Sequence, residues 1–555
     1  MRGNRFAVAA LVLVVSQLFA GLGLAAAPAG KKFVQLGWDM PTTQYLRANW
    51  REMDETALFD GVIYQAAIQR DGKDVWTSAM WEATPWQREW FASVVQDLKT
   101  CAFNQLTDNF LRLNCSPGTL DWFDDAGWAA LVNKIAIAGW IVRDGRQKGV
   151  CFDFESYGEP QFRFQPARGK PFAEAAAMAR ERGAQVMGAL ASECPDATIL
   201  TLWLNSANVA AGKLSDPMAG LAGESYGLLP PFVDGMIEAM PSTMTLVDGC
   251  ESAYLYDSSE AYLLAYNIIR QTNGPCARLV SPENRPKYRA QVQAGFGFYL
   301  DAYANADTSY WYIGGGDGSR LERLQRNLTY AREVCDQYVW VYGEQYRWWP
   351  TSYADPASSA GKMWEDAVPG ITQAIRWAKD PVVAARHAIE SEPLVNLLAN
   401  ASFSEGASAE GALPVGWGAW QDEKTSHGSF PLDRAVGRSA GGSARMSGVA
   451  NGCFIQTVEV KPGERYAVCA HVHSVGSGVT TVTVRWQDAN GRWMAWDRDS
   501  TSVFGAVVGG WSETTNAVQV PEGVGRLVLL LSVSNQTGES DQCWYDDVAV
   551  YRLGS

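Results

Sequence analysis

GVCFDFESYG, residues 149–158, has the pattern of a buried strand that ends in two carboxylates and a glycine-containing turn. Side chains alternate along a strand, so Cys151, Asp153 and Glu155 share one face and the apolar residues between them share the other. Strands of parallel sheets are apolar on both faces, and charge appears where they end. Two acids at one strand end suit general acid/base or nucleophilic chemistry. For an isolated pair of this kind, the alternative is a solvated loop or a structural ion pair.

The pattern of short apolar strand and amphipathic helix recurs from Phe33 to Val341, which predicts βα units around a parallel sheet. The eight candidate strands are Phe33–Asp39, Gly61–Gln65, Phe110–Asn114, Gly149–Glu155, Ile199–Asn205, Thr243–Asp248, Gly295–Asp301 and Tyr338–Glu344. The clearest helical segments between them are Trp86–Thr100, Asp125–Gln147 and Ala173–Cys194. Eight units fit an α/β chain that forms a (β/α)8 TIM barrel. An open doubly wound sheet is the alternative.

Nearly every predicted strand ends in a polar side chain, and barrels build their active sites at these strand ends. We expect Glu155 to be the proton donor, kept protonated by its apolar neighbours and by the charge of Asp153, which acts as a helper. Its partner carboxylate is expected to be Glu251, with Asp248 or Glu344 as substitutes. The residues expected to bind substrate are Trp38, Asp39, Trp203, Asn205, Tyr299, Asp301, Trp340 and Tyr342.

Several classes of function are excluded by what the sequence lacks. No histidine occurs between residues 30 and 386, which rules out Ser-His and Cys-His nucleophiles and His-ligated metals there. No GxGxxG or Walker loop is present to hold a nucleotide, and no cofactor is expected for catalysis. The net charge of −14 argues against nucleic acid as a partner. The 23 tryptophans, by contrast, supply flat rings that can stack on sugars.

The first 27 residues have the pattern of a signal peptide. Arg2 and Arg5 precede an apolar run from Phe6 to Leu24, and small residues follow it. The alternative is a retained membrane anchor. No later stretch is long and apolar enough to span a bilayer. We therefore expect a secreted or periplasmic protein with no membrane association after cleavage. Cysteines can form disulfides in such compartments, and Cys101 with Cys115 is a candidate pair.

The composition changes after Ser391-Glu392-Pro393, which marks a domain boundary. Residues 30–390 are expected to form the barrel, which is the catalytic domain. Beyond them the chain has short β-rich runs separated by Gly and Ser turns, as in Val479–Trp486 and Gly525–Ser534. This spacing predicts an all-β sandwich domain over residues 396–553.

The C-terminal domain resembles the jelly-roll carbohydrate-binding modules of families four, nine and twenty-two over essentially all of residues 396–553. The matching pieces include NLLANASF (396–403), PVGW (414–417), GRSA (437–440), VKPG (460–463) and WYDDV (544–548). The resemblance implies a structural calcium ion held by Glu405 and Asp547, because hard cations prefer carboxylate oxygens. It also implies sugar stacking on rings among Trp417, Trp420, Trp493 and Trp496. Some members of this fold bind no sugar and act as spacers.

The N-terminal domain resembles secreted glycoside hydrolase barrels. The run GVCFDFE (149–155) is similar to the fourth strand of chitinase-like family eighteen barrels, which ends in D-x-E. There the Glu is the acid and the Asp supports a substrate N-acetyl group. Lys148 and Cys151 stand where that family carries two further Asp residues, so an N-acetyl sugar and the substrate-assisted mechanism do not follow.

Together these features predict a secreted glycoside hydrolase that cleaves a poly- or oligosaccharide by a two-carboxylate mechanism. The alternative is a non-catalytic glycan-binding protein on a degenerate hydrolase barrel, which would lack a pair of acids facing one pocket. A polysaccharide lyase is a third option, but the acidic chain makes an anionic substrate less attractive.

Overall fold

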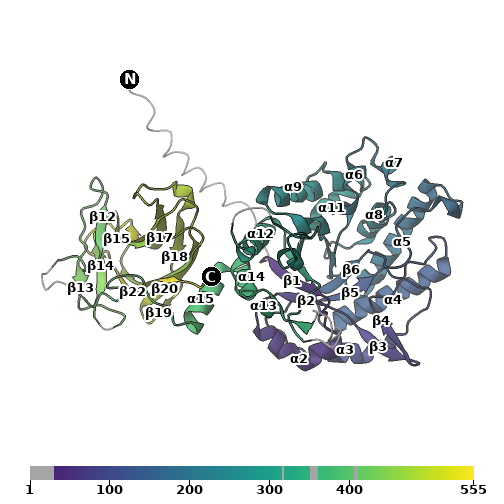
Figure 1. The fold of residues 1–555 in the computed structure, drawn as a ribbon, viewed down its shortest axis with the longest axis horizontal. Coiled ribbons are helices and arrows are strands. Elements are labelled where there is room, and N and C mark those ends of the chain that lie inside the picture. Colours follow the sequence, from purple (N-terminus) through teal and green to yellow (C-terminus); the bar gives the residue numbers. More distant parts are fainter. Residues whose placement is uncertain (1–29, 315–317, 351–360, 406–410, 440, 555) are drawn as a thin grey trace, which may run out of the picture. The chain divides into compact units, whose positions relative to one another are not determined.

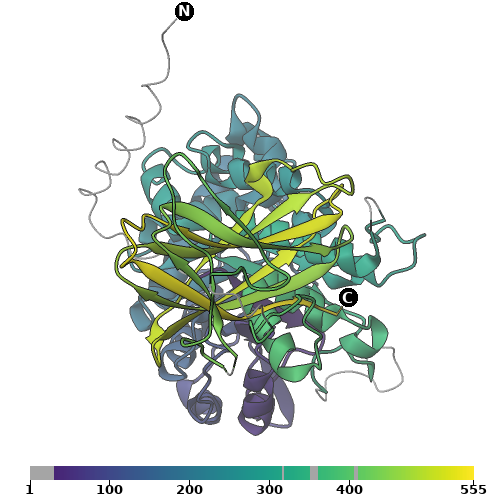
Figure 2. The ribbon, with the colours of Figure 1, turned by 90° about the vertical axis from the view of Figure 1, so that its left-hand side faces the viewer.

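The computed structural model describes residues 30–314, 318–350, 361–405, 411–439 and 441–554. The predicted signal peptide, residues 1–27, lies outside them. The chain divides into two compact units, Met1–Ile371 and Thr372–Ser555, which are described separately below. Figure 1 labels their helices and strands, and in Figure 2 the strands of the second unit face the viewer.

Unit 1 is built on a parallel sheet that has nine strands in its described part, in the order β10-β11-β1-β2-β5-β6-β7-β8-β9. Their bounds are β1 Lys32–Gly37, β2 Gly61–Tyr64, β5 Phe110–Asn114, β6 Gly149–Asp153, β7 Thr198–Thr201, β8 Thr245–Asp248, β9 Val292–Ala294, β10 Phe296–Tyr299 and β11 Tyr338–Gly343. One residue, Gly295, separates β9 from β10, so the two ends of this order adjoin. The sheet is therefore a nearly closed, barrel-like structure rather than an open one.

The prediction of eight strands was wrong in number because a further strand, β9 (Val292–Ala294), directly precedes the seventh predicted strand, Gly295–Asp301, which contains β10. β9 pairs with β8 and β10 pairs with β11, so the two strands have different neighbours. The break falls at Gly295, where an added Cβ would lie 2.8 Å from a Val247 methyl and 3.0 Å from the Tyr338 carbonyl oxygen. A glycine at such a close approach of backbones commonly marks a bend or a bulge.

Helices lie between the strands of the sheet, except between β9 and β10, and α13 follows β11; they surround the sheet in Figure 1. They are α2 Thr43–Glu55, α3 Ala92–Lys99, α4 Asp125–Asp144, α5 Phe172–Glu193, α6 Val209–Gly212, α7 Pro217–Leu221, α8 Leu229–Ala239, α9 Ser259–Arg270, α10 Pro275–Arg278, α11 Arg285–Gln291, α12 Arg320–Val334 and α13 Trp364–Ala367. A small antiparallel hairpin, β3 Ala67–Arg70 with β4 Lys73–Trp76, follows β2. Because helices cover the outer face, the strands are buried on both faces, as residues 149–153 of β6 show.

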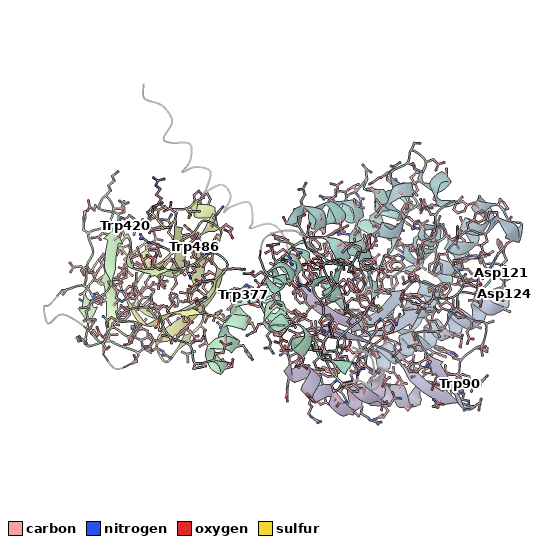
Figure 3. The ribbon with its side chains drawn as sticks, in the orientation of Figure 1. Trp90, Asp121, Asp124, Trp377, Trp420 and Trp486 are labelled. Carbon is pink, nitrogen blue, oxygen red and sulfur yellow. The ribbon has the colours of Figure 1, made fainter. Side chains whose placement is uncertain are left out.

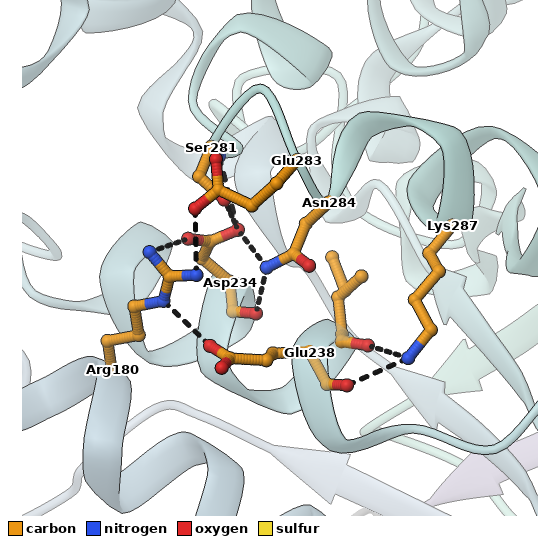
Figure 4. A network of polar contacts seen from close by, with 8 residues as sticks. Arg180, Asp234, Glu238, Ser281, Glu283, Asn284 and Lys287 are labelled. Carbon is orange, nitrogen blue, oxygen red and sulfur yellow. Dashed lines mark hydrogen bonds and ion pairs between the residues drawn. The ribbon is translucent and has the colours of Figure 1, made fainter.

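A polar network fastens the helices outside the sheet (Figure 4). Arg180 on α5 forms ion pairs with Asp234 at 3.3 Å and Glu238 at 2.9 Å, both on α8, and with Glu283 at 3.1 Å. Asn284 donates to the Asp234 carboxylate at 2.9 Å. The network joins α5 and α8 to the start of α11. The residues at the strand ends are not part of it.

Unit 2 has two antiparallel sheets in its described part, ordered β12-β15-β21-β17-β18 and β13-β14-β22-β16-β20-β19. The strands are β12 Gly418–Gln421, β13 Leu432–Asp433, β14 Ser443–Ser447, β15 Asn451–Glu459, β16 Arg465–Val475, β17 Val479–Gln487, β18 Ser500–Val503, β19 Val507–Val508, β20 Trp511–Gln519, β21 Arg526–Ser534 and β22 Gln542–Arg552. Both sheets contribute to one apolar core, as Trp486 of the first and Tyr545 of the second show. The antiparallel β architecture follows the prediction, and the jelly-roll connection remains a prediction.

Two helices, α14 Ile371–Lys379 and α15 Pro381–Ser391, pack against the six-stranded sheet of unit 2. Trp377, Ala384 and Ala388 form an apolar cluster there with Ala467 of β16 and Leu553. The structure thus places this helical stretch with the β unit.

Two further sequence expectations concern cysteines and membranes. All ten cysteines lie in the described part of the chain and are free thiols, so the candidate pair Cys101 and Cys115 does not form a bridge. Among the helices described, none combines the length and apolar character needed to cross a bilayer.

Candidate active site

The carboxyl ends of the strands of unit 1 surround a cavity of about 710 Å³. Seven of the predicted site residues line it, namely Glu155, Glu251, Glu344, Trp38, Tyr299, Trp340 and Tyr342. Six others do not line it, namely Asp39, Asp153, Trp203, Asn205, Asp248 and Asp301. The cavity therefore separates the predicted residues into those that face a ligand and those that support the walls.

Glu155 enters the cavity from the loop that follows β6. Its backbone N–H donates to the buried Asp153 carboxylate at 3.0 Å, and its carbonyl accepts from Asn114 at 2.7 Å. Asp153 in turn forms an ion pair with Arg112 at 2.9 Å. Burial raises the pKa of Glu155, a hydrogen bond from Tyr157 opposes the rise, and the charge of Asp153 adds to it. Asp153 thus positions Glu155 and is not itself exposed to a ligand.

Glu251 opens a short 3-10 helix, η4 (Glu251–Leu255), directly after β8. The turn needs Gly249, where an added Cβ would lie 2.0 Å from the Thr201 carbonyl oxygen, and it places Cys250 at φ 41°. Trp340 donates from Nε1 to the Gly249 carbonyl at 2.8 Å and holds the turn in place. This backbone directs Glu251 back into the cavity.

The carboxyl group of Glu251 titrates far from its ordinary range. Burial raises its pKa to about 8, and the negative charges of Glu155, Asp153 and Glu344 add to the rise. A hydrogen bond with Tyr254 opposes it. At neutral pH, Glu251 is therefore a protonated acid beside other carboxylates.

Glu344, the third carboxylate of the cavity, follows β11 and is exposed. Tyr342 donates from its hydroxyl to Glu344 at 3.0 Å, and Trp38 donates from Nε1 to the same hydroxyl at 3.2 Å. The backbone N–H of Glu344 donates to buried Asp301 at 2.8 Å. Its carboxylate is thus held at the cavity but remains open to solvent.

Three tyrosines form one side of the cavity, which we call the tyrosine wall: Tyr254, Tyr299 and Tyr342. Their ring centroids are 5.0, 5.7 and 5.9 Å apart, and their planes lie within 25° of one another. Trp311 stands nearly perpendicular to this wall, at 81° to Tyr299 and 74° to Tyr254. Trp340 is fully buried behind Tyr254, with a centroid distance of 5.3 Å. Ring faces and edges therefore meet at one corner of the cavity.

The buried acids Asp39, Asp248 and Asp301 have a shared structural role. Each carboxylate accepts backbone N–H groups from the loop after a neighbouring strand. The donors are Trp348 for Asp39, Leu204 and Ser206 for Asp248, and Glu344 and Gln345 for Asp301. Burial raises the pKa of Asp39 and of Asp301 to about 6. These acids fasten the loops around the cavity.

The predicted binding residues Trp203 and Asn205 are buried in the wall of unit 1. Asn205 donates to the Cys276 carbonyl at 3.0 Å, and Trp203 packs edge-on against Tyr226. Sequence reasoning missed Tyr157, Tyr254 and Trp311, which do line the cavity. A signal existed for the two tyrosines, because each follows a candidate acid by two or three residues, whereas Trp311 had only its aromatic neighbours 310 and 312.

In unit 2, Asp547 forms an ion pair with Arg438 at 2.6 Å and accepts from Ser439 at 2.8 Å. Glu405 is exposed, and its backbone N–H donates to Asn400. Within the described ranges, no group of three or more His, Cys, Asp or Glu side chains could hold a metal ion. The Arg438 guanidinium thus pairs with the Asp547 carboxylate, and the calcium ion stays a prediction.

No protein-family model and no curated protein matches this chain. Among solved structures, it is similar to the enzymatically active domain of bacteriophage CBA120 tailspike protein 4, with 17% identity over 29% of this chain and a TM-score of 0.22. That match spans only 22% of the tailspike chain. It is also similar to the xylan-binding domain CBM22-1 of Paenibacillus barcinonensis, with 16% identity over 30% of this chain and 99% of that domain and a TM-score of 0.21. A cyclase from Fischerella gives 14% identity, 29% and 97% coverage and a TM-score of 0.23. Scores this low support no conclusion about function.

Proposed function

We propose that unit 1 is a glycoside hydrolase in which Glu155 and Glu251 are the two reacting carboxyl groups. The observation that carries this proposal is that both half-buried carboxyls line one aromatic cavity, close enough for the charge of one to shift the titration of the other. Hydrolysis of a glycosidic bond requires such a pair, one protonated and one ionised. The predicted signal peptide fits an enzyme that acts outside the cytoplasm.

The environments of the two acids favour Glu251 as the proton donor, which reverses the roles expected from the sequence. Its pKa of about 8 keeps it protonated at neutral pH. Burial also raises the pKa of Glu155, but there a hydrogen bond from Tyr157 and the charge of Arg112 oppose the rise. Glu251 would protonate the glycosidic oxygen as the bond from the anomeric carbon breaks and its electron pair moves to that oxygen. Glu155 would attack the anomeric carbon directly, or take a proton from the water that does so.

The aromatic surfaces account for sugar binding in this proposal. Trp311, which is 43% exposed and borders the tyrosine wall, offers a flat apolar face on which the C–H face of a sugar ring can stack. Trp38 extends this surface outward, since 64% of its side chain is exposed. A cavity of about 710 Å³ lies within the range typical of small-ligand sites.

The alternative of a non-catalytic glycan-binding protein predicts no pair of acids facing one pocket. The pairing of a protonated Glu251 with Glu155 therefore favours the hydrolase. We further propose that unit 2 binds glycan. Trp420 of β12 is 51% exposed and borders a groove of about 720 Å³, while Trp417 and Trp486 are buried in the core. Figure 3 labels Trp420 and Trp486 in this unit.

The proposal is tested by screening the mature chain for hydrolysis of a panel of oligosaccharides, with products followed by reducing-end assay and mass spectrometry. Glu155→Gln and Glu251→Gln should each lower kcat on natural glycans by about 10³-fold or more while binding is retained. With aryl glycosides that have strongly acidic leaving groups, Glu251→Gln should recover most of its rate, and Glu155→Gln should not.

The matched control is Glu181→Gln, which changes an exposed glutamate on α5 and should leave kcat and KM unaltered. Undiminished turnover in both cavity variants would overturn the assignment. Recovery by Glu155→Gln rather than by Glu251→Gln would restore the roles expected from the sequence.

A further inference from the structure

The cavity of unit 1 has an unbalanced set of charges. Three carboxyl groups line it, those of Glu155, Glu251 and Glu344, and Arg112 is the only basic side chain among its described lining residues. Arg112 is already paired with buried Asp153 at 2.9 Å, and only 22% of its side chain is exposed. The cavity therefore presents negative charge that its own walls do not neutralise.

Glu344 is the most accessible part of this charge. Its backbone is fixed by Asp301 and its side chain accepts from the Tyr342 hydroxyl, so its position is set before any ligand arrives. Within the described residues it forms no ion pair, whereas the largely buried Arg112 of the same cavity pairs with Asp153. A prepositioned carboxylate without a cation is ready to accept a charge-assisted hydrogen bond from a ligand.

The aromatic corner next to Glu344 suits a cation as well. Tyr342 and Tyr299 belong to the tyrosine wall, and Trp311 stands at 81° to Tyr299 with a centroid distance of 5.8 Å. The two rings meet edge to face, so the ring that presents its edge keeps both of its own negative faces free of the other ring. Ammonium groups are bound at such corners, and a carboxylate beside the rings strengthens the attraction.

We propose that this cavity takes a glycan unit that carries a free ammonium group, with the nitrogen held between the Glu344 carboxylate and the corner formed by Trp311 and the tyrosine wall. This inference rests on the proposed hydrolase function and names the class of its substrate, an amino sugar without an N-acyl group. Uronic acids and sulfated sugars are disfavoured because they would bring negative charge to a cavity that already holds the Glu344 carboxylate. Neutral sugars can stack on the same rings but gain nothing from Glu344.

The inference is tested by isothermal titration calorimetry on the full mature chain carrying Glu155→Gln, which prevents turnover. The probes are β-1,4-linked tetrasaccharides of glucosamine, of N-acetylglucosamine and of glucose, which differ only at the carbon-2 substituent. We expect the glucosamine probe to bind about tenfold more tightly than the other two at low ionic strength. The preference should shrink at about 0.5 M NaCl, because the cation–carboxylate attraction is screened there.

Adding Glu344→Gln should bring the three affinities within about twofold of one another, whereas adding the control Glu181→Gln should leave the preference intact. A variant with Trp311→Ala should lose affinity for all three probes and should also lose part of the preference. Equal affinities in the parent chain, or a preference that survives Glu344→Gln, would overturn the inference.

The test also separates this inference from the function on which it rests. If the wild-type chain hydrolyses neutral glycans without any preference for amines, the hydrolase stands and the ammonium site falls. If the glucosamine probe binds preferentially through Glu344 while no glycan of the panel is cleaved, the ammonium site is supported and the proposed hydrolase function is rejected.

Discussion

Replacing Glu251 by Gln is expected to stabilise unit 1 at alkaline pH while it removes the proposed proton donor. Burial and three neighbouring acids raise the pKa of Glu251 from its ordinary 4.5 to about 8. The folded chain therefore keeps this proton over a pH range in which the unfolded chain has released it. At about 1.36 kcal/mol per pH unit, the whole difference corresponds to ~4.8 kcal/mol. Because the side chain is only half-buried, solvent screening reduces the expected effect to about 2 kcal/mol.

The sign of this effect depends on pH in a defined way. Below pH 4.5 both the folded and the unfolded chain hold the Glu251 proton, so the stabilisation is fully present. As the pH rises from 4.5 toward 8, the unfolded chain ionises first and the free energy of unfolding falls. Above about pH 8 the folded chain ionises too, and the loss becomes constant. Since Gln does not titrate, the advantage of Glu251→Gln over the wild type should grow across this window.

The assay is urea unfolding of the full mature chain, followed by tryptophan fluorescence at about pH 4 and about pH 9. We expect a difference in unfolding free energy near zero at the lower pH and about 2 kcal/mol in favour of Glu251→Gln at the higher. Glu181→Gln, at an exposed position on α5, should track the wild type at both. A difference that does not change with pH would refute the idea that the fold holds Glu251 protonated, and its role as the acid would fall with it.

Three further outcomes are expected. The kcat/KM of the wild type should fall above about pH 8, where Glu251 loses its proton. For Glu251→Gln on activated aryl glycosides, this fall at alkaline pH should disappear. If it persists, another group is responsible for the fall. Asp153→Asn should lower the free energy of unfolding in urea by about 3 kcal/mol because it leaves the largely buried Arg112 without its counter-charge; a change below about 1 kcal/mol would contradict this. Gly249→Ala should lower kcat more than it raises KM, because the new Cβ would lie 2.0 Å from a β7 carbonyl oxygen and displace the turn that directs Glu251 into the cavity. The control Gly223→Ala, with no heavy atom within 4 Å of its new Cβ, should leave both constants unaltered.

The strands were predictable because their signal is local. The run Phe110–Asn114 coincides with β5, and the predicted Gly149–Glu155 overlaps β6 over all five of its residues. A short apolar run that is bounded by polar residues needs no long-range information to be recognised. The separate strand β9 before Gly295 was not predictable in this way. It depends on how closely Gly295 approaches Val247 and Tyr338, which are about 45 residues away on either side of it in the sequence.

The site was predictable only in part, because the sequence does not show which backbone groups need an acceptor. Asp301 accepts from the backbone of Glu344 and Gln345, more than 40 residues further along the chain. Asp39 accepts from Trp348, which is 309 residues away. Polar residues at strand ends therefore looked alike in the sequence, although some serve the fold and others face the cavity.

In three places a buried aspartate accepts a hydrogen bond from the backbone beside a cavity glutamate, as in the D-x-E stretch of residues 153–155. Asp153 accepts from the N–H of Glu155, and Asp301 accepts from the N–H of Glu344. Asp248 accepts from the N–H of Cys250, which directly precedes Glu251. Each cavity glutamate thus follows a backbone turn that a buried aspartate holds. The shorter aspartate side chain accepts from N–H groups near its strand end, whereas the glutamate, which has one more methylene, reaches the cavity. Glu155 and Glu251 follow the same strand as their aspartate, and Glu344 follows the neighbouring strand β11. An Asp→Asn change at any of the three turns should therefore shift the position of the neighbouring glutamate. In each pair the aspartate supports the backbone and the glutamate is the reactive group, so the two do not form a catalytic dyad.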